Sequence, residues 1–182
     1  LACDHASLAR IRSRTIDLPI RRQGFSTDRR SWESRHRGNR LKIYFAGSIR
    51  GGRADKDKYF EIIEFLSEQA EVLTEHVGST GLGGEGEKQL QDDEIYRRDL
   101  NWLSCADAVI AEVSQPSLGV GYEIGVAEKI GKPILCLFDE SQSEFRLSAM
   151  LSGNPKVQVI RYRAIGEAKR RISEFVSHLS QT

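Results

Sequence analysis

The sequence has little net charge, no long apolar run and few cysteines, and each shortage argues against a class of protein. Its 182 residues hold 27 Lys and Arg against 26 Asp and Glu, a formal net charge of +1. Proteins that bind the phosphate backbone of nucleic acids carry a marked surplus of Lys and Arg, which is missing here. The longest apolar runs are about five residues, far short of the roughly 20 that span a membrane. Three cysteines without metal-type spacing disfavour a disulfide framework and a zinc cluster, and indicate an intracellular, reduced protein.

The charge is unevenly distributed along the chain. Residues 1–40 contain ten arginines and four acidic residues, a net of +6, which leaves −5 for residues 41–182. The first segment has few large apolar residues and no helical or strand period, so burial cannot offset the entropy of ordering it. We predict a disordered basic arm over 1–40 and one globular domain over 41–182. An organellar transit peptide is the alternative for the arm, disfavoured by its acidic residues, and we expect a cytoplasmic or nuclear protein.

From Leu41 onward, short apolar runs alternate with longer amphipathic stretches. This alternation predicts an α/β fold, a three-layer, doubly wound sheet of five mostly parallel strands like those of Rossmann and flavodoxin folds. Ligands of such sheets bind beyond the carboxyl ends of the strands, where the strand order reverses. The predicted strands are 41–46, 72–77, 108–113, 133–138 and 157–162, and the predicted helices are 59–70, 92–105, 118–130, 144–151 and 165–179.

A glycine-rich turn follows the first predicted strand. Its glycines allow the backbone to approach an anion, Ser48 adds a hydroxyl, and Arg50 offers a guanidinium fork suited to phosphate. The turn matches neither the Gly-x-Gly-x-x-Gly nor the Walker pattern, so binding of a dinucleotide or nucleoside triphosphate by those routes is not supported. A site for a phosphate monoester is our hypothesis, and a plain tight turn is the alternative. The residues of this turn are Gly47, Ser48, Ile49, Arg50, Gly51, Gly52 and Arg53.

Three glycines, Gly119, Gly121 and Gly125, lie in the predicted third helix. Each costs about 1 kcal/mol relative to alanine in a helix interior, so we expect another group to approach closely there. Packing of the helix on the sheet is the alternative for Gly125, and a dinucleotide turn is disfavoured because the wider fingerprint is missing. Glu123 lies near the start of this helix, where the helix dipole stabilises an anionic carboxylate. This favours a nucleophile, with a solvated surface glutamate as the alternative.

Three other residues are ambiguous when taken alone. Asp99 follows two arginines on a predicted helix, where a carboxylate is usually solvated or paired. His76 occupies the ligand-facing end of the second predicted strand, although a structural role is the more common one. Cys136 is predicted to be a buried core residue without a redox role. Asp99 and Glu123 near a phosphate loop suggest glycosyl transfer, in which one carboxylate attacks the anomeric carbon while the other assists the leaving group or orients the substrate.

The motifs, in order and spacing, closely resemble the 2'-deoxynucleoside 5'-phosphate N-hydrolases, which are related to the nucleoside 2-deoxyribosyltransferases. The resemblance covers about residues 41–162 and is carried by Tyr44–Gly52, Leu73–Val77, Asp99–Leu103, Ala111–Glu123, Ile134–Phe138 and Leu147–Met150. It implies hydrolysis of the N-glycosidic bond of a 2'-deoxynucleoside 5'-monophosphate to free base and 2-deoxyribose 5-phosphate, without a metal or organic cofactor. The family also includes enzymes that clear modified nucleotides such as 5-hydroxymethyl-dUMP.

The resemblance also implies roles for individual residues. Glu123 would be the nucleophile that forms a covalent deoxyribosyl intermediate, Asp99 would assist at the sugar and base, and Tyr44 would position the nucleophile. The loop at 47–53 and Ser117 would receive the 5'-phosphate. Family members are homodimers in which the segment matching Ser148 to Met150 reaches the neighbouring subunit's site. The implied substrate-binding residues are Gly47, Ser48, Ile49, Arg50, Gly51, Gly52, Arg53, His76, Ser117, Gly119, Ser148, Ala149 and Met150.

Two other functions stay open at this stage. A nucleoside 2-deoxyribosyltransferase would transfer the sugar to a second base instead of to water, and Arg50 with its phosphate loop disfavours this reading. A non-catalytic module with the same fold would bind a deoxynucleoside monophosphate and release no product.

Overall fold

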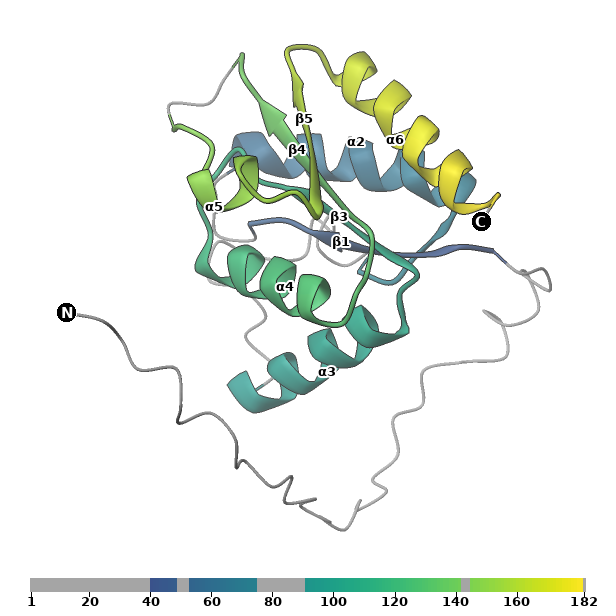
Figure 1. Ribbon diagram of the computed structural model, residues 1–182, viewed down its shortest axis with the longest axis vertical. Helices are drawn as coiled ribbons and strands as arrows, with labels where there is room; N and C mark the ends of the chain where they lie inside the picture. Colours follow the sequence, from purple (N-terminus) through teal and green to yellow (C-terminus); the bar gives the residue numbers. More distant parts are fainter. Residues whose placement is uncertain (1–39, 49–52, 75–90, 142–144, 182) are drawn as a thin grey trace, which may run out of the picture. The chain divides into compact units, whose positions relative to one another are not determined.

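The computed structural model describes residues 40–48, 53–74, 91–141 and 145–181 (Figure 1). Apart from Arg40, the predicted arm over 1–40 lies outside these residues. No helix in the described part of the chain is long and apolar enough to cross a membrane. In chain order the elements are β1 (Lys42–Ala46), α2 (Arg53–Gln69), β2 (Glu71–Val72), α3 (Asp92–Cys105), β3 (Ala108–Glu112), α4 (Leu118–Lys129), β4 (Ile134–Asp139), α5 (Ala149–Ser152), β5 (Val157–Tyr162) and α6 (Ile165–Leu179).

The strands form one five-stranded sheet in the order β2-β1-β3-β4-β5. Every pair of neighbouring strands in this sheet is parallel. The predicted doubly wound α/β fold is therefore confirmed, with the strand order of flavodoxin-like proteins. The order reverses between β1 and β3, so the carboxyl ends of these two strands mark the expected ligand crevice.

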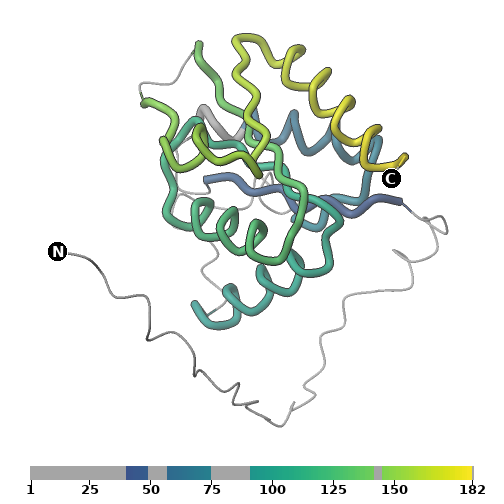
Figure 2. The backbone as a smooth tube through the Cα atoms, in the orientation of Figure 1, coloured from purple at the N-terminus to yellow at the C-terminus, as the bar shows by residue number. Residues whose placement is uncertain are grey.

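Helices cover both faces of the sheet and make the three layers (Figures 1 and 2). Successive strand residues point to opposite faces. Ile43 and Phe45 of β1 pack with buried residues of α2 and α6, whereas Tyr44 and Ala46 pack with buried residues of α3 and α4. We call these the α2/α6 face and the α3/α4 face. All residues of β3 and β4 are buried, as expected for central strands that are covered on both sides.

The second predicted strand is wrong in its length. It was expected over 72–77, but β2 covers Glu71–Val72 and a turn follows at Leu73 and Thr74. The Thr74 hydroxyl accepts a hydrogen bond from the Phe45 N–H at 2.9 Å and donates one to the Phe45 carbonyl at 2.7 Å. A side chain thus occupies the backbone groups of β1 that a longer strand would pair, which ends the ladder.

The predicted helix over 144–151 is also shorter than expected, because α5 begins at Ala149. Ser148 precedes it as the N-cap, and its hydroxyl oxygen accepts a hydrogen bond from the Met150 N–H at 3.3 Å. This cap fixes the start of the helix.

The predicted helix over 59–70 is too short at its start, because α2 begins six residues earlier, at Arg53, and ends at Gln69. The other differences are boundary shifts of one residue, at the start of β1, the end of β3, both ends of β4 and the end of α4.

Candidate active site

A buried tyrosine and a half-buried glutamate meet beside the carboxyl end of β1. Tyr44 is 2% exposed and points from β1 to the α3/α4 face, where α4 carries Glu123. The Tyr44 hydroxyl donates a hydrogen bond to Oε1 of Glu123 at 2.7 Å. The fold therefore joins two predicted catalytic residues that lie 79 positions apart in the sequence.

The environment of Glu123 raises the pKa of its carboxyl group to near neutral pH. Burial raises the pKa of Glu123 to about 7, the hydrogen bond from Tyr44 opposes this rise, and the charge of Asp99 adds to it. Burial, followed by the charge of Glu123, raises the pKa of Tyr44 far above its ordinary value. Tyr44 is therefore a permanent hydrogen-bond donor, and Glu123 changes between acid and carboxylate near pH 7.

Asp99 lies in α3 and is held by the residue before it. Nε and Nη2 of Arg98 each lie 2.9 Å from Oδ1 of Asp99. The guanidinium also lies over the ring of Trp102, 4.7 Å from its centroid. A carboxylate on a helix is usually either solvated or paired, and Asp99 is paired, with Arg98. Arg98 was missed as a site residue, and its adjacency to Asp99 in the sequence was the only signal available.

Ser117 caps the helix that carries Glu123. Its hydroxyl oxygen accepts a hydrogen bond from the Val120 N–H at 3.3 Å, and its carbonyl accepts one from the Gly121 N–H at 3.0 Å. Ser117 therefore lies at the positive end of the α4 dipole, where unpaired backbone N–H groups favour an anion. The contact of Ser117 to a phosphate stays a prediction.

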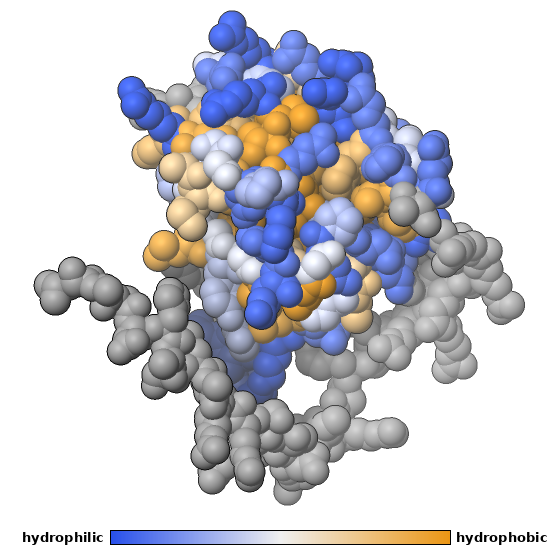
Figure 3. All heavy atoms as spheres, in the orientation of Figure 1, coloured by the Kyte–Doolittle hydropathy of each residue, from blue (hydrophilic) through white to orange (hydrophobic). Residues whose placement is uncertain are grey.

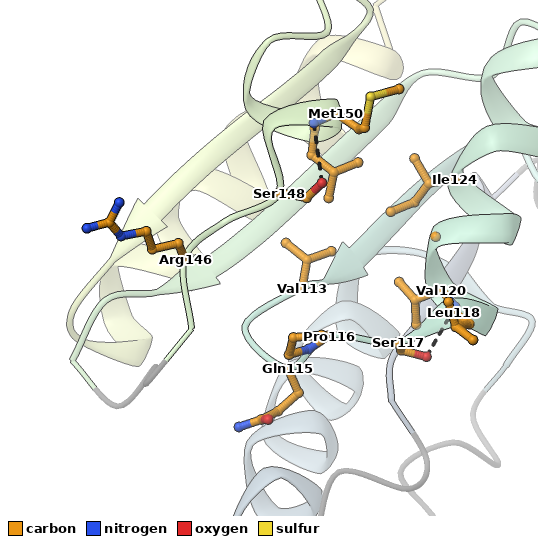
Figure 4. A pocket seen from close by; sticks show the side chains of 12 residues that line it. Val113, Gln115, Pro116, Ser117, Leu118, Val120, Ile124, Arg146, Ser148 and Met150 are labelled. Carbon is orange, nitrogen blue, oxygen red and sulfur yellow. Dashed lines mark hydrogen bonds between the residues drawn. The ribbon is translucent and has the colours of Figure 1, made fainter.

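A pocket of about 440 Å³ opens beside this helix start. Ser117 and Val120 lie on one side of it, and Ser148 and Met150 lie on the other (Figure 4). Apolar side chains such as Val113 supply much of the lining.

Ser148 and Met150 thus line a pocket of their own chain together with Ser117, whereas the resemblance places them in the neighbouring subunit's site. The predicted catalytic residues Tyr44, Asp99 and Glu123 are not among the residues that line this pocket. Ala149 is exposed at the start of α5.

The glycines of α4 are not required by packing within the described residues. An added Cβ at Gly121 or Gly125 would meet nothing within 4 Å, and one at Gly119 would lie 3.8 Å from Oγ of Ser117. The alternative that Gly125 serves helix-on-sheet packing is therefore wrong, because this residue faces outward. Gly47 is different, since a Cβ there would lie 3.2 Å from the rings of both Phe45 and Tyr59. An alanine at this position would press on both rings.

Several predicted residues lie outside what the structure describes, namely Ile49, Arg50, Gly51, Gly52, His76 and the side chain of Arg53. Ser48 is buried where β1 ends, and Arg53 begins α2. Cys136 is fully buried in β4, as predicted, and burial raises the pKa of its thiol to about 12. In the described ranges, no group of three or more His, Cys, Asp and Glu side chains could hold a metal ion.

Comparison with known proteins identifies the family. A model of the nucleoside 2-deoxyribosyltransferase family matches residues 43–158. The chain belongs to this family. The matched residues include every predicted catalytic residue, from Tyr44 through Asp99 to Glu123, and the match ends within β5.

Two relatives are similar to this chain in sequence, and one solved structure is similar to it in fold. It is 47% identical over 141 residues to a 5-hydroxymethyl-dUMP N-hydrolase of Tetraodon nigroviridis, covering 76% of this chain and 99% of the relative. It is 52% identical over 124 residues to the human 5-hydroxymethyl-dUMP N-hydrolase, covering 68% of this chain and 70% of the relative. The solution structure of BlsM is 24% identical with a TM-score of 0.62, over 77% of this chain and 91% of that one, and shares the fold.

Proposed function

We propose that this protein hydrolyses the N-glycosidic bond of 2'-deoxynucleoside 5'-monophosphates, releasing the free base and 2-deoxyribose 5-phosphate. The observation that carries the proposal is the hydrogen-bonded pair of Tyr44 and Glu123 at the reversal point of the sheet. The similarity of the chain to 5-hydroxymethyl-dUMP N-hydrolases also supports the proposal, and one of these relatives is matched over 99% of its length.

The pair suits a two-step displacement at the anomeric carbon. Tyr44 holds one oxygen of Glu123 by a hydrogen bond, and the second oxygen attacks C1' as the C1'–N bond breaks. The bonding electrons leave with the base, which takes up a proton. Water then attacks C1' of the glutamyl ester, the carboxylate is released, and the water's second proton passes to solvent. Asp99 assists at the sugar and base, with Arg98 holding its Oδ1.

The remote 5'-phosphate supplies binding energy that orients the sugar. Its proposed partners are the turn at 47–53 and Ser117 at the start of α4, where the helix dipole favours a dianion. A plain nucleoside leaves such donors unpaired and is rejected for that reason. A 2'-hydroxyl withdraws electrons from the cationic transition state, so removal of that group makes the deoxyribosyl bond easier to break.

The direct test is base release from a panel of nucleotides, 5-hydroxymethyl-dUMP, dUMP, dCMP, dAMP and dGMP, followed by chromatography. We expect the wild-type protein to cleave at least one of them, and Glu123→Gln to lower the rate by about a thousandfold or more. The same reaction with a second free base reveals a deoxyribosyltransferase if a new nucleotide forms. Binding of a nucleotide without any product would instead indicate a non-catalytic module, and a folded Glu123→Gln variant with the wild-type rate would eliminate the assigned nucleophile.

We also propose a homodimer in which Ser148 to Met150 complete the neighbouring subunit's site. Large apolar side chains of α3, α4 and α5 are exposed, with Leu118 at 97%, Met150 at 80%, Tyr122 at 53% and Tyr96 at 51%. Figure 3 shows apolar surface among the hydrophilic groups on the side of the molecule in view. Clustered exposure of this kind is typical of an association surface.

Sedimentation of the wild-type protein and of Met150→Asp tests this proposal. We expect a dimer for the wild type and dissociation together with loss of base release for the variant, since a charge is costly in an apolar interface. A fully active monomer at micromolar concentration would contradict it.

A further inference from the structure

A second polar cluster lies at the carboxyl edge of the sheet, on the α2/α6 face and away from Tyr44 and Glu123. Glu112 at the end of β3 is fully buried, Ser114 is 2% exposed, and Asp139 at the end of β4 is 4% exposed. Carboxylates are almost never fully buried unless they are paired, because desolvation is expensive. Nothing in the proposed reaction uses these residues, so their burial calls for an explanation.

Ser114 links the ends of two neighbouring strands. Its hydroxyl donates a short hydrogen bond to Oε1 of Glu112, and its backbone N–H donates one to Oε2 at 3.3 Å. The same hydroxyl oxygen accepts a hydrogen bond from the Asp139 N–H at 2.7 Å. Tyr162 at the end of β5 adds a third donor to Glu112, at 3.4 Å. These three donors tie the Glu112 carboxyl group to Ser114 and to the end of β5.

Asp139 extends the cluster to α2. Its carboxylate pairs with Nζ of Lys58 at 2.9 Å, and the two side chains are only 5% and 12% exposed. Ser141 adds a hydroxyl donor at 2.7 Å and a backbone donor at 2.9 Å. Burial alone would raise the pKa of Asp139, but Ser141 and Lys58 outweigh it and hold the pKa below its ordinary value. We call Glu112, Ser114, Asp139 and Lys58 the edge network.

Residues of the edge network lie next to both segments that are proposed to bind phosphate. Ser114 begins the connection that reaches the α4 cap three residues later, at Ser117. Lys58 belongs to α2, which begins at Arg53 at the end of the predicted phosphate turn. Tyr59, next to Lys58, packs edge-on against Phe45 with ring centroids 6.0 Å apart, and its ring limits the space at Gly47. Movement of α2 would therefore move the end of β1 at which the turn starts.

We propose that the edge network positions the phosphate-binding side of the site, by fixing the Ser114–Ser117 connection and the start of α2 relative to the sheet. The proposal rests on the function proposed above and adds Glu112, Ser114, Asp139 and Lys58 as positioning residues that do not touch the substrate. Buried hydrogen bonds and a buried ion pair suit this role because they are directional, whereas apolar packing tolerates small shifts.

Glu112→Gln is the sharpest variant, because the amide has the same size but replaces one acceptor by a donor. In one orientation the amide NH2 group faces the Ser114 N–H, which can only donate. In the other it faces the hydroxyls of Ser114 and Tyr162, which must then accept instead of donate, so the hydrogen bonds of the network have to rearrange. Ser114→Ala removes the link to the Asp139 N–H, and Lys58→Met removes the ammonium that ties α2 to β4. These two variants keep the proposal testable if the Gln protein does not fold.

The matched control is Glu61→Gln. Glu61 also lies on α2 and pairs with Lys169 of α6 at 2.8 Å, but this pair is 45% and 29% exposed. Exposed pairs of this kind contribute little to structure. We expect Glu61→Gln to match the wild type in every measurement below.

The experiment combines steady-state kinetics, on the nucleotide that the wild type cleaves fastest, with calorimetric binding of 2-deoxyribose 5-phosphate. For the edge-network variants we expect KM and the Kd of the sugar phosphate to rise about tenfold or more, with kcat within about twofold. A merely structural role would lower the folded fraction, and hence kcat, and leave KM and Kd unchanged. That result would overturn the proposal.

The binding arm separates this proposal from the proposed function. If the wild type binds 2-deoxyribose 5-phosphate but releases no base, the hydrolase assignment fails and the Kd values still decide the role of the edge network. If the wild type neither binds the sugar phosphate nor releases base, both fall.

Discussion

The two faces of the sheet solve different problems. On the α2/α6 face, apolar residues of β1, β3 and β4 pack with α6, whose Ala168, Ile172 and Val176 are spaced four residues apart and buried. On the α3/α4 face, the helices carry two half-buried carboxylates, Asp99 and Glu123, and α4 has three glycines. Apart from the edge network at its carboxyl edge, the α2/α6 face is an apolar core, whereas the α3/α4 face carries polar and flexible residues where the chemistry is proposed.

This difference shows where the protein trades stability for reactivity. A carboxylate whose pKa is raised by burial costs free energy in its ionised form, and glycines weaken a helix. Destabilising residues of this kind cluster at functional sites, where the stability of the rest of the fold compensates for them. Substitutions in the apolar core of the α2/α6 face and in the candidate site on the α3/α4 face should therefore affect different measurements.

The largest expected effect on stability is on the α2/α6 face. Ile172→Ala should lower the free energy of unfolding by about 2–5 kcal/mol, since Ile172 is fully buried and its loss leaves a cavity. The kcat of the folded protein should stay within about twofold, because Ile172 packs in the core on the opposite face of the sheet from Tyr44 and Glu123. Denaturant titration and base-release kinetics measure the two quantities. The control, Phe60→Ala on the exposed side of α2, should change stability by about 0.5 kcal/mol or less.

Tyr44→Phe should show the reverse pattern. We expect kcat/KM to fall about 10- to 100-fold at pH 7, because the nucleophile loses its positioning hydrogen bond. In the wild type, kcat/KM should rise with pH through about 7 as Glu123 ionises. The Tyr44 hydrogen bond lowers the pKa of Glu123, so its loss should move this limb to higher pH. Titration of the substrate phosphate, with a pKa of about 6, is common to both proteins and cancels in the comparison.

If the rise of kcat/KM with pH lies at the same pH in Tyr44→Phe as in the wild type, the proposed role of Tyr44 on the α3/α4 face is contradicted. It would mean that Tyr44 serves packing alone and that another group sets the charge of Glu123.

Glu123→Gln should make the protein more stable as it removes activity. The folded pKa of about 7 lies above the ordinary value of 4.5, so the folded state binds the proton more tightly. Stability from this carboxyl is fully present below about pH 4.5 and is lost as the pH rises through 7. The neutral amide escapes that loss, so we expect a gain on the order of 2 kcal/mol at pH 8 and almost none at pH 4.5. Thermal unfolding at both pH values measures it, and equal differences at the two would contradict the account.

The smallest effect concerns the glycines of α4. Gly125→Ala should stabilise the chain by about 0.5–1 kcal/mol, since alanine favours the helix and the added Cβ meets open space. Gly47→Ala is the opposite control and should destabilise, because its Cβ would press on Phe45 and Tyr59. Denaturant titration at low protein concentration compares them. Destabilisation by Gly125→Ala would show that this surface of α4 is occupied.

The sequence predicts the sheet well because its central strands are uniform. The apolar run of β4 and the amphipathic spacing of α6 need no distant information, and both elements were predicted nearly to the residue. The end of β2 could not be predicted, because it depends on the Thr74 side chain bonding the backbone of Phe45, 29 residues away. Secondary-structure propensity depends on neighbouring residues and cannot predict such a long-range contact.

The candidate site was predicted only in part, for a similar reason. The sequence pattern indicated Asp99 and Glu123, the resemblance added Tyr44, and the fold brings Tyr44 and Glu123 into contact. Neither the pattern nor the resemblance indicated the edge network, because Glu112 lies in an otherwise apolar strand. The meaning of its burial depends on Tyr162, 50 residues away, and on Asp139 at the end of β4.

The central claim is that the Glu123 carboxylate attacks the sugar, and trapping that bond tests it most directly. A 2'-fluoro substituent withdraws electrons and slows the second step, so a 2'-fluoro-2'-deoxynucleotide should leave the enzyme glycosylated after one turnover. We predict one equivalent of released base and a matching mass increase on the peptide that contains Glu123, absent in Glu123→Gln. Release of base with no adduct, or with the adduct on another residue, would contradict the account.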